Sequence, residues 1–275
     1  MEWVRASHDG VTLVARVEGA GPDVLLLHGW PDTGALWDEV APRLVAAGHR
    51  VIVPDLRGCG RSDKPREVER YAMHHLVADA LAVLDAAGST RAGVVGHDWG
   101  AALAWALATY HPERVRALVA MSVGHPSAFR SGGIAQQMRS WYTLLFALEG
   151  VGERFVRFND HEVLRTWFAH PRAEAVIAEL ERDGQLSTHL NWYRANLPPD
   201  AFLSDPPVLP DLAVPALGIW SSGDRALTEE QMTGSARYCA AGFDYVRLEG
   251  PGHWIPLEAG DEVTKVLSTF RPLSR

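Results

Sequence analysis

The sequence predicts an α/β fold, in which a mostly parallel sheet is flanked by helices and carries an inserted helical cap. In the first half of the chain, short apolar runs alternate with stretches of helical character, as in successive strand–helix–strand units. The same alternation returns near the C-terminus, whereas strand signals vanish in between. A chain of 275 residues has the length of one large domain, or of one domain with an insertion.

Four strands are expected in the first half, where short runs rich in Val, Leu and Ile are bounded by Gly, Pro or Asp. Their continuous apolarity favours strands that are covered on both faces, as in a parallel sheet. These runs are residues 24–27, 51–53, 93–95 and 118–121. Helices are expected between them, over residues 35–47, 73–87 and 101–111.

The last third of the chain predicts two more strands and two more helices. The strands are expected over residues 216–220 and 243–248, and the helices over residues 229–241 and 260–270. The stretch before them is helical and rich in Trp, Phe and Arg, and it closes with six prolines between Pro198 and Pro215, which suit an extended return segment. We therefore expect a core formed by residues 1–124 and 205–275, with a helical cap over residues 125–204.

The composition excludes several classes of protein. Lysine and arginine number 26 and aspartate and glutamate 34, and the formal net charge of −8 argues against a nucleic-acid partner. No apolar run reaches the ~18 residues of a membrane span, and residues 1–5 lack the basic-then-apolar start of a signal peptide. Because two cysteines cannot form a disulfide framework, we expect a cytoplasmic protein. The lack of a long apolar run means that we expect no membrane association. The sequence does not indicate an oligomeric state.

The strongest local signal is the segment Gly96-His97-Asp98-Trp99-Gly100, which follows an expected strand and opens an Ala-rich helix. Two glycines around a sharp strand-to-helix turn are typical of a nucleophile elbow, in which the middle residue is usually Ser. Here the middle residue is Asp98. Asp is also a favoured helix N-cap, so a purely structural role is the alternative. The strand–turn–helix context favours the nucleophile.

A carboxylate nucleophile predicts a definite chemistry. Attack by Asp98 on a saturated carbon expels a leaving group and forms an alkyl ester, which water can cleave at the carboxyl carbon. Attack by the same carboxylate on an ordinary ester would give a mixed anhydride. The presence of Asp at this position therefore argues against a simple esterase.

The segment Leu27-His28-Gly29-Trp30-Pro31 follows the first predicted strand and is the candidate oxyanion loop. A glycine at the strand end lets main-chain N–H groups face the elbow. We expect the amides of Trp30 and Trp99 to stabilise the negative charge that develops on the Asp98 carbonyl oxygen during ester hydrolysis. An ordinary strand-to-loop turn is the alternative for this segment.

The candidate base and its orienting acid follow the last two predicted strands. His253 lies in the loop Glu249-Gly250-Pro251-Gly252-His253-Trp254, and Asp224 lies in Ser221-Ser222-Gly223-Asp224. The order Asp98, Asp224, His253 is the nucleophile–acid–histidine order of this kind of sheet. We expect His253 to activate water and Asp224 to fix its tautomer. A turn-capping Asp and an unremarkable His are the alternatives.

With these motifs placed, the whole chain resembles the epoxide hydrolases of the α/β-hydrolase fold. That family has no cofactor or metal and uses two cap tyrosines to hold the epoxide oxygen and protonate the alkoxide, which the resemblance assigns to Tyr142 and Tyr193. The resemblance implies an epoxide of small-molecule size as substrate, and the aromatic residues of the cap indicate that it is apolar. The neighbouring residues expected to contact this substrate are His28, Pro31, Trp141 and Trp192.

Two alternatives remain open from the sequence. A haloalkane dehalogenase shares the Asp ester but needs N–H donors for a halide, and Trp99 fits one of these roles, whereas Trp30 stands where many dehalogenases have Asn. A fluoroacetate dehalogenase would have Arg in place of Trp99. A non-catalytic binding protein with the hydrolase fold is a third reading, against which the set Asp98, Asp224 and His253 argues.

Overall fold

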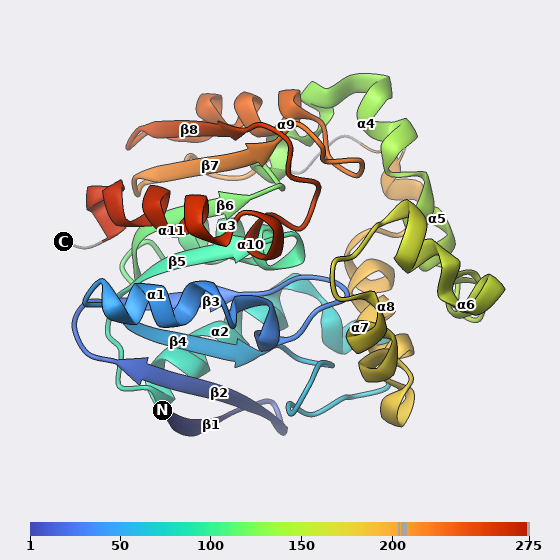
Figure 1. The fold of residues 1–275 in the computed structure, drawn as a ribbon, viewed down its shortest axis with the longest axis horizontal. Helices are drawn as coiled ribbons and strands as arrows, with labels where there is room; N and C mark the ends of the chain where they lie inside the picture. The colour runs from blue at the N-terminus through green and yellow to red at the C-terminus, as the bar shows by residue number, and fades with distance from the viewer. Residues whose placement is uncertain (203, 205–207, 274–275) are drawn as a thin grey trace.

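One sheet of eight strands forms the centre of the computed structural model, which describes residues 1–202, 204 and 208–273 (Figure 1). The strand order is β1-β2-β4-β3-β5-β6-β7-β8. The strands are β1 Glu2–His8, β2 Val11–Gly19, β3 Asp23–Leu27, β4 Arg50–Asp55, β5 Ala92–His97, β6 Val115–Met121, β7 Ala216–Ser221 and β8 Phe243–Leu248. The α/β class and all six predicted strands are confirmed.

The sheet is parallel from β4 to β8 in its strand order, whereas β2 runs antiparallel to both β1 and β4. Because the parallel strands share one direction, the loops after β3, β5, β7 and β8 open at the same edge of the sheet, where ligands bind in open α/β sheets. The strands β1 and β2 were not predicted from the sequence. β1 is an edge strand with mostly exposed side chains, so it carries no continuous apolar run.

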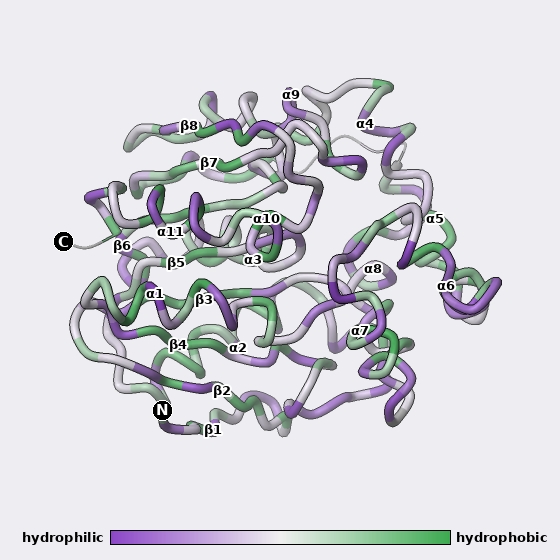
Figure 2. Tube along the Cα trace, viewed as in Figure 1, coloured by the Kyte–Doolittle hydropathy of each residue, from purple (hydrophilic) through white to green (hydrophobic). Residues whose placement is uncertain are grey.

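Helices cover both faces of the sheet. Alternate side chains of β3 separate two cores: Leu25 and Leu27 pack with helices α2 and α3, and Val24 and Leu26 pack with α1 and α11. The central strands are accordingly the most continuously hydrophobic part of the trace (Figure 2). The helices outside the insertion are α1 Val40–Ala46, α2 Met73–Ala86, α3 Trp99–Tyr110, α9 Glu229–Thr233, α10 Ile255–Glu258 and α11 Gly260–Thr269.

Two of the predicted helices are shorter than expected. Residues 35–47 form a 3₁₀ turn, Gly34–Trp37, and then α1. Pro42 lacks an N–H group and is tolerated only in a first helical turn, so the α-helix begins next to it. Residues 229–241 form α9 and a 3₁₀ turn, Gly234–Tyr238, and the glycine that separates them is a weak helix former.

The segment between β6 and β7 is helical in the part that the structure describes, and residues 126–202 are called the helical insertion below. It lies beyond the carboxyl edge of the sheet (Figure 1). Its α-helices are α4 Gly133–Arg139, α5 Trp141–Phe146, α6 Val151–Glu162, α7 Ala173–Leu180 and α8 Gln185–Asn196. Part of the predicted return segment, residues 205–207, lies outside the described residues. No helix among those described is long and apolar enough to span a membrane.

Candidate active site

Asp98 occupies a sharp turn between β5 and α3. Its backbone has φ 54° and ψ −123°, a conformation that a residue other than glycine adopts only when its surroundings impose it. Glycines on both sides permit the close crossing: a Cβ at Gly96 would lie 2.2 Å from the carbonyl oxygen of Gly100, and one at Gly100 would lie 2.1 Å from that of Leu27. The geometry is that of a nucleophile elbow.

The two carboxylate oxygens of Asp98 have different surroundings. Oδ1 accepts a hydrogen bond from the main-chain N–H of Trp30 at 2.9 Å, whereas Oδ2 lies 3.6 Å from Nε2 of His253. A Cβ at Gly29 would lie 2.5 Å from Oδ1, so only glycine lets the oxyanion loop approach this closely. Trp99 is the first residue of α3, and its N–H therefore lacks an acceptor within the helix.

His253 and Asp224 form a buried pair beside this carboxylate. Nδ1 of His253 lies 2.9 Å from Oδ2 of Asp224 and must carry the proton that it donates, because a carboxylate only accepts. The other oxygen of Asp224 accepts from the main-chain N–H groups of Ala226 and Leu227, at 2.8 and 2.9 Å. Burial raises the pKa of Asp224, but His253 and the two amides outweigh it and hold this pKa below its ordinary value.

The carboxylates set the charge of His253. Burial alone lowers the pKa of its imidazole, but Asp224 and Asp98 outweigh this effect and raise the pKa to about 10. While both carboxylates are ionised, His253 is therefore protonated at neutral pH. Loss of the charge on Asp98 removes one of the two effects that raise the pKa of His253.

His97 contacts the main chain of His253 from the other side, a contact that the sequence analysis did not predict. Its Nε2 lies 2.8 Å from the main-chain oxygen of His253 and donates to it, and the Ser122 hydroxyl lies 3.3 Å from the same oxygen. Burial and the neighbouring His253 lower the pKa of His97 to about 4, so its ring is neutral. No local motif marks this contact, which joins residues far apart in the chain.

The two predicted tyrosines come together above the elbow. Tyr142 lies in α5 and Tyr193 in α8; their ring centroids are 6.4 Å apart, and both side chains are buried. Burial and the charges of Asp98 and Asp224 raise the pKa of Tyr142, and burial, Tyr142 and Asp98 raise that of Tyr193. Both phenols consequently keep their protons at neutral pH and can donate hydrogen bonds.

Residues 22–260 match the family described as alpha/beta hydrolase fold. The chain belongs to this family. Its relatives include "AB hydrolase superfamily protein YfhM" of Bacillus subtilis, 31% identical over 95% of both chains. They also include "Epoxide hydrolase" of Caballeronia sordidicola, 31% identical over 95% of this chain and 91% of the relative.

Solved structures support the same assignment. A structure described as a novel epoxide hydrolase from metagenomes of hot environments superposes with a TM-score of 0.86, at 27% identity and 98% coverage of both chains. A mutant epoxide hydrolase from Bacillus megaterium superposes with a TM-score of 0.85, at 25% identity and full coverage of both chains.

Of the remaining predicted site residues of this alpha/beta hydrolase, two form hydrogen bonds with the main chain and two differ in their exposure to solvent. His28 is fully buried and engages the main chain through both ring nitrogens, accepting from the N–H of Leu56 and donating to the oxygen of Gly29. The indole N–H of Trp192 donates to the oxygen of Arg57 at 3.0 Å. Pro31 is buried, whereas Trp141 is 40% exposed. Their contacts with a substrate remain a prediction.

An aromatic wall surrounds the tyrosines of the hydrolase. The ring of Trp30 lies 4.8 Å from Phe146 and 5.1 Å from Phe168, and Phe168 lies 5.0 Å from Tyr142, between ring centroids. These side chains come from the oxyanion loop and from two parts of the helical insertion, α5 and the residue that follows the turn Val163–Trp167. Tyr142 and Tyr193 therefore lie among apolar rings.

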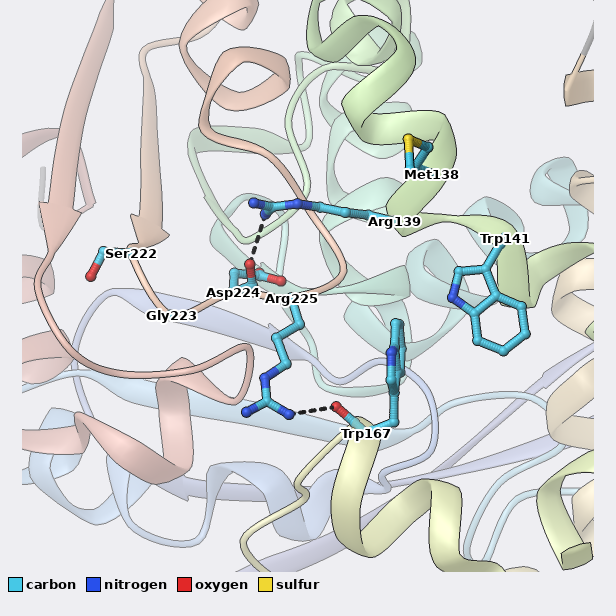
Figure 3. Close-up of a pocket in the computed structure, with 8 residues that line it drawn as sticks. All are labelled: Met138, Arg139, Trp141, Trp167, Ser222, Gly223, Asp224 and Arg225. Atoms are coloured by element: carbon cyan, nitrogen blue, oxygen red, sulfur yellow. Dashed lines mark hydrogen bonds between the residues drawn. The ribbon is translucent and has the colours of Figure 1, made fainter.

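Two cavities reach the acid and the base from outside. One of about 500 Å³ lies between Met138, Trp141 and Trp167 of the helical insertion and the loop around Asp224 (Figure 3). The other, of about 270 Å³, is lined by His253, among others. Neither is lined by Asp98, which is buried. Within the described part of the chain, no cluster of His, Cys, Asp or Glu has the form of a metal site.

Proposed function

We propose that the protein is an epoxide hydrolase that converts a small, apolar epoxide into a vicinal diol through a covalent ester on Asp98. Epoxide hydrolases among its relatives and structural neighbours support the activity. The observation that carries the mechanism is the pair of buried, protonated tyrosines near Asp98, whose Oδ2 accepts no main-chain hydrogen bond. In this proposal residues 125–204 act as a cap over a core of residues 1–124 and 205–275.

The first half-reaction uses the unlike oxygens of Asp98. Oδ2, which lacks the amide donor held by Oδ1, attacks a ring carbon, and the bond between that carbon and the epoxide oxygen breaks. The alkoxide that forms is a strong base, and Tyr142 and Tyr193 bind it and supply a proton. Their raised pKa values keep both phenols protonated until the ring opens.

The second half-reaction is hydrolysis of the ester. Ester formation removes the charge of Asp98, and His253 then releases its proton to solvent. The neutral imidazole, oriented by Asp224, takes a proton from water, and the resulting hydroxide attacks the carboxyl carbon of Asp98. The amides of Trp30 and Trp99 stabilise the oxyanion of the tetrahedral intermediate. When the intermediate collapses, His253 returns its proton to the leaving oxygen of the diol. The second proton of water leaves as the new carboxyl group ionises and restores the protonated tyrosines through solvent.

A haloalkane dehalogenase remains the second candidate. The indole N–H of Trp30 is buried and, among the described residues, has no hydrogen-bond partner, so it would suit a halide. The indole N–H of Trp192 would not suit a halide, because it already donates to the main-chain oxygen of Arg57.

One experiment separates the candidates. The protein is given styrene oxide and 1-bromobutane in turn, and diol and bromide release are measured. Diol without bromide supports the proposal, bromide without diol replaces it by a dehalogenase, and neither product favours a binding protein.

The tyrosines provide the mechanistic test. Tyr193→Phe should slow ester formation by about 10²–10⁴-fold, the usual contribution of a positioned acid. Tyr110→Phe is the matched control, because Tyr110 is 54% exposed on α3 and should leave the rate unchanged. A Tyr193→Phe variant that opens the epoxide at the normal rate would remove the assigned role.

A further inference from the structure

The loop that carries Asp224 is held by a side chain of the helical insertion. Nη1 of Arg139, the last residue of α4, donates to the main-chain oxygens of Asp224 at 2.8 Å and of Leu227 at 2.7 Å. Figure 3 shows the Arg139 side chain extending from α4 to Asp224, while Arg225 points the other way, to Trp167. The main chain of the acid is therefore fixed from outside the sheet.

Gln136, one turn earlier in α4, holds the same loop. Its Nε2 donates to the main-chain oxygen of Ala226 at 2.9 Å, and its Oε1 accepts from the N–H of Thr228 at 2.9 Å. Gln136 is only 1% exposed, so water does not compete for these bonds. Together the two side chains of α4 engage four main-chain groups between Asp224 and Thr228.

The core and the loop itself supply the other contacts, among them the bond from Nε2 of Gln231 in α9 to the main-chain oxygen of Thr228 at 2.9 Å. The indole N–H of Trp220 shares the oxygen of Leu227 at 3.2 Å, and the N–H groups of Gly223 and Asp224 bond to Pro251 and Ser221. What α4 adds are the bonds to the main-chain oxygens of Asp224 and Ala226 and to the N–H of Thr228, together with a second bond to the oxygen of Leu227.

The same short segment presents the proton donor. Tyr142 follows Arg139 by three residues, and Nε2 of Gln136 also donates to the hydroxyl of Ser140 at 2.8 Å, at the junction of α4 and α5. The junction is fixed as well by the Thr143 hydroxyl, which donates to the main-chain oxygen of Ser140. Arg139, which holds the loop of Asp224, and Tyr142, the proton donor of the first half-reaction, therefore lie within one turn of the chain.

We propose that Arg139 and Gln136 are positioning residues for ester hydrolysis, which hold the main chain that presents Asp224 to His253. This inference rests on the function proposed above. Arg139 acts through geometry, because it donates to uncharged carbonyl oxygens and the ionised state of Asp224 is set by His253 and two amides. A displaced acid misorients the imidazole, and a displacement of about 1 Å can slow a step by up to about 100-fold.

The test is a single-turnover measurement that follows the ester on Asp98 by protein mass. Arg139→Met should slow ester hydrolysis by about tenfold or more and leave ester formation within about twofold, so that the ester accumulates. Arg139→Lys, which retains a donor, should restore part of the hydrolysis rate. Arg225→Met is the matched control: it removes an arginine of the same cavity that contacts Thr166 and Trp167 instead of the acid, and no ester should accumulate.

The outcomes are distinguishable. Normal ester hydrolysis in a folded Arg139→Met protein overturns the inference and leaves the proposed function intact. An equal loss of both steps also overturns it, since that indicates general damage to the site. If Arg139→Met does not fold, Arg139→Gln takes its place in the same measurement: slowed hydrolysis with normal ester formation supports the inference, and normal hydrolysis overturns it. Absence of any ester in the unaltered protein, with a substrate that gives diol, overturns both proposals.

Discussion

Replacement of Asp98 by Asn should convert His253 from an acid into a base near neutral pH. The variant keeps the size of the side chain and removes its negative charge, as ester formation does. Nε2 of His253 lies 3.6 Å from Oδ2 of Asp98, and both side chains are buried. Asp224 is unchanged in the variant, so the comparison isolates the effect of one carboxylate.

The expected size of the change follows from the distance. Two unit charges 3.6 Å apart interact by about 5 kcal/mol at an effective dielectric constant of about 20. Since about 1.36 kcal/mol corresponds to a change of one in pKa, the pKa of His253 should fall from about 10 by roughly 3 in Asp98→Asn. The imidazole would then lose its proton close to pH 7, when the ester is present and a base is needed.

NMR titration of the imidazole Cε1–H signals provides the assay, with His253→Gln used to assign the resonance. In single-turnover kinetics, ester hydrolysis should accordingly increase with pH around neutrality, whereas ester formation should not require a neutral histidine. A pKa of His253 that is the same in both proteins, or higher in Asp98→Asn, would refute this electrostatic reasoning.

Three further predictions concern the elbow, the stability and the buried ion pair. Gly29→Ala places a Cβ about 2.5 Å from Oδ1 of Asp98 and should slow ester formation by about 100-fold in stopped-flow measurements; an unchanged rate contradicts the steric argument. The raised pKa of His253 stabilises the fold below its ordinary value of 6.5, and this contribution disappears as the pH rises to about 10. The free energy of unfolding, measured with urea, should therefore fall over this range more in the unaltered protein than in His253→Gln; equal slopes contradict this. Asp79→Ala leaves the buried guanidinium of Arg57 without its carboxylate and should reduce the free energy of unfolding by about 3–5 kcal/mol, whereas a loss under about 1 kcal/mol would show that water replaces the partner.

The sequence was sufficient to predict the centre of the fold and the geometry around Asp98. Buried parallel strands need apolar residues on both faces, and the elbow needs glycines where main chains nearly touch, so both leave local patterns. The edge strand β1 leaves none, because its exposed side chains obey no such constraint. The break before α1 was detectable in principle, since Pro42 limits where a helix can begin.

The residues that hold the candidate catalytic groups were beyond prediction from the sequence. Arg139 and Asp224 are 85 positions apart, and His97 and His253 are 156 apart, so no short motif contains either pair. Both contacts go to main-chain oxygens, which any residue at the accepting position would supply. The sequence therefore carries no sign of the partner. The cap boundaries and the roles of the tyrosines stay predictions until they are tested.

The helical insertion enters the chain between β6 and β7, immediately ahead of the strand that presents Asp224, and it bonds back to the loop after that strand. Protein engineers who exchange caps between related enzymes to change substrate range should regard residues 224–228 as part of the transplant. A foreign cap without counterparts of Gln136 and Arg139 would bring a new substrate pocket together with a misaligned acid. Under the proposed mechanism such chimeras would accumulate the ester on Asp98, and grafting those two side chains would be the first repair to attempt.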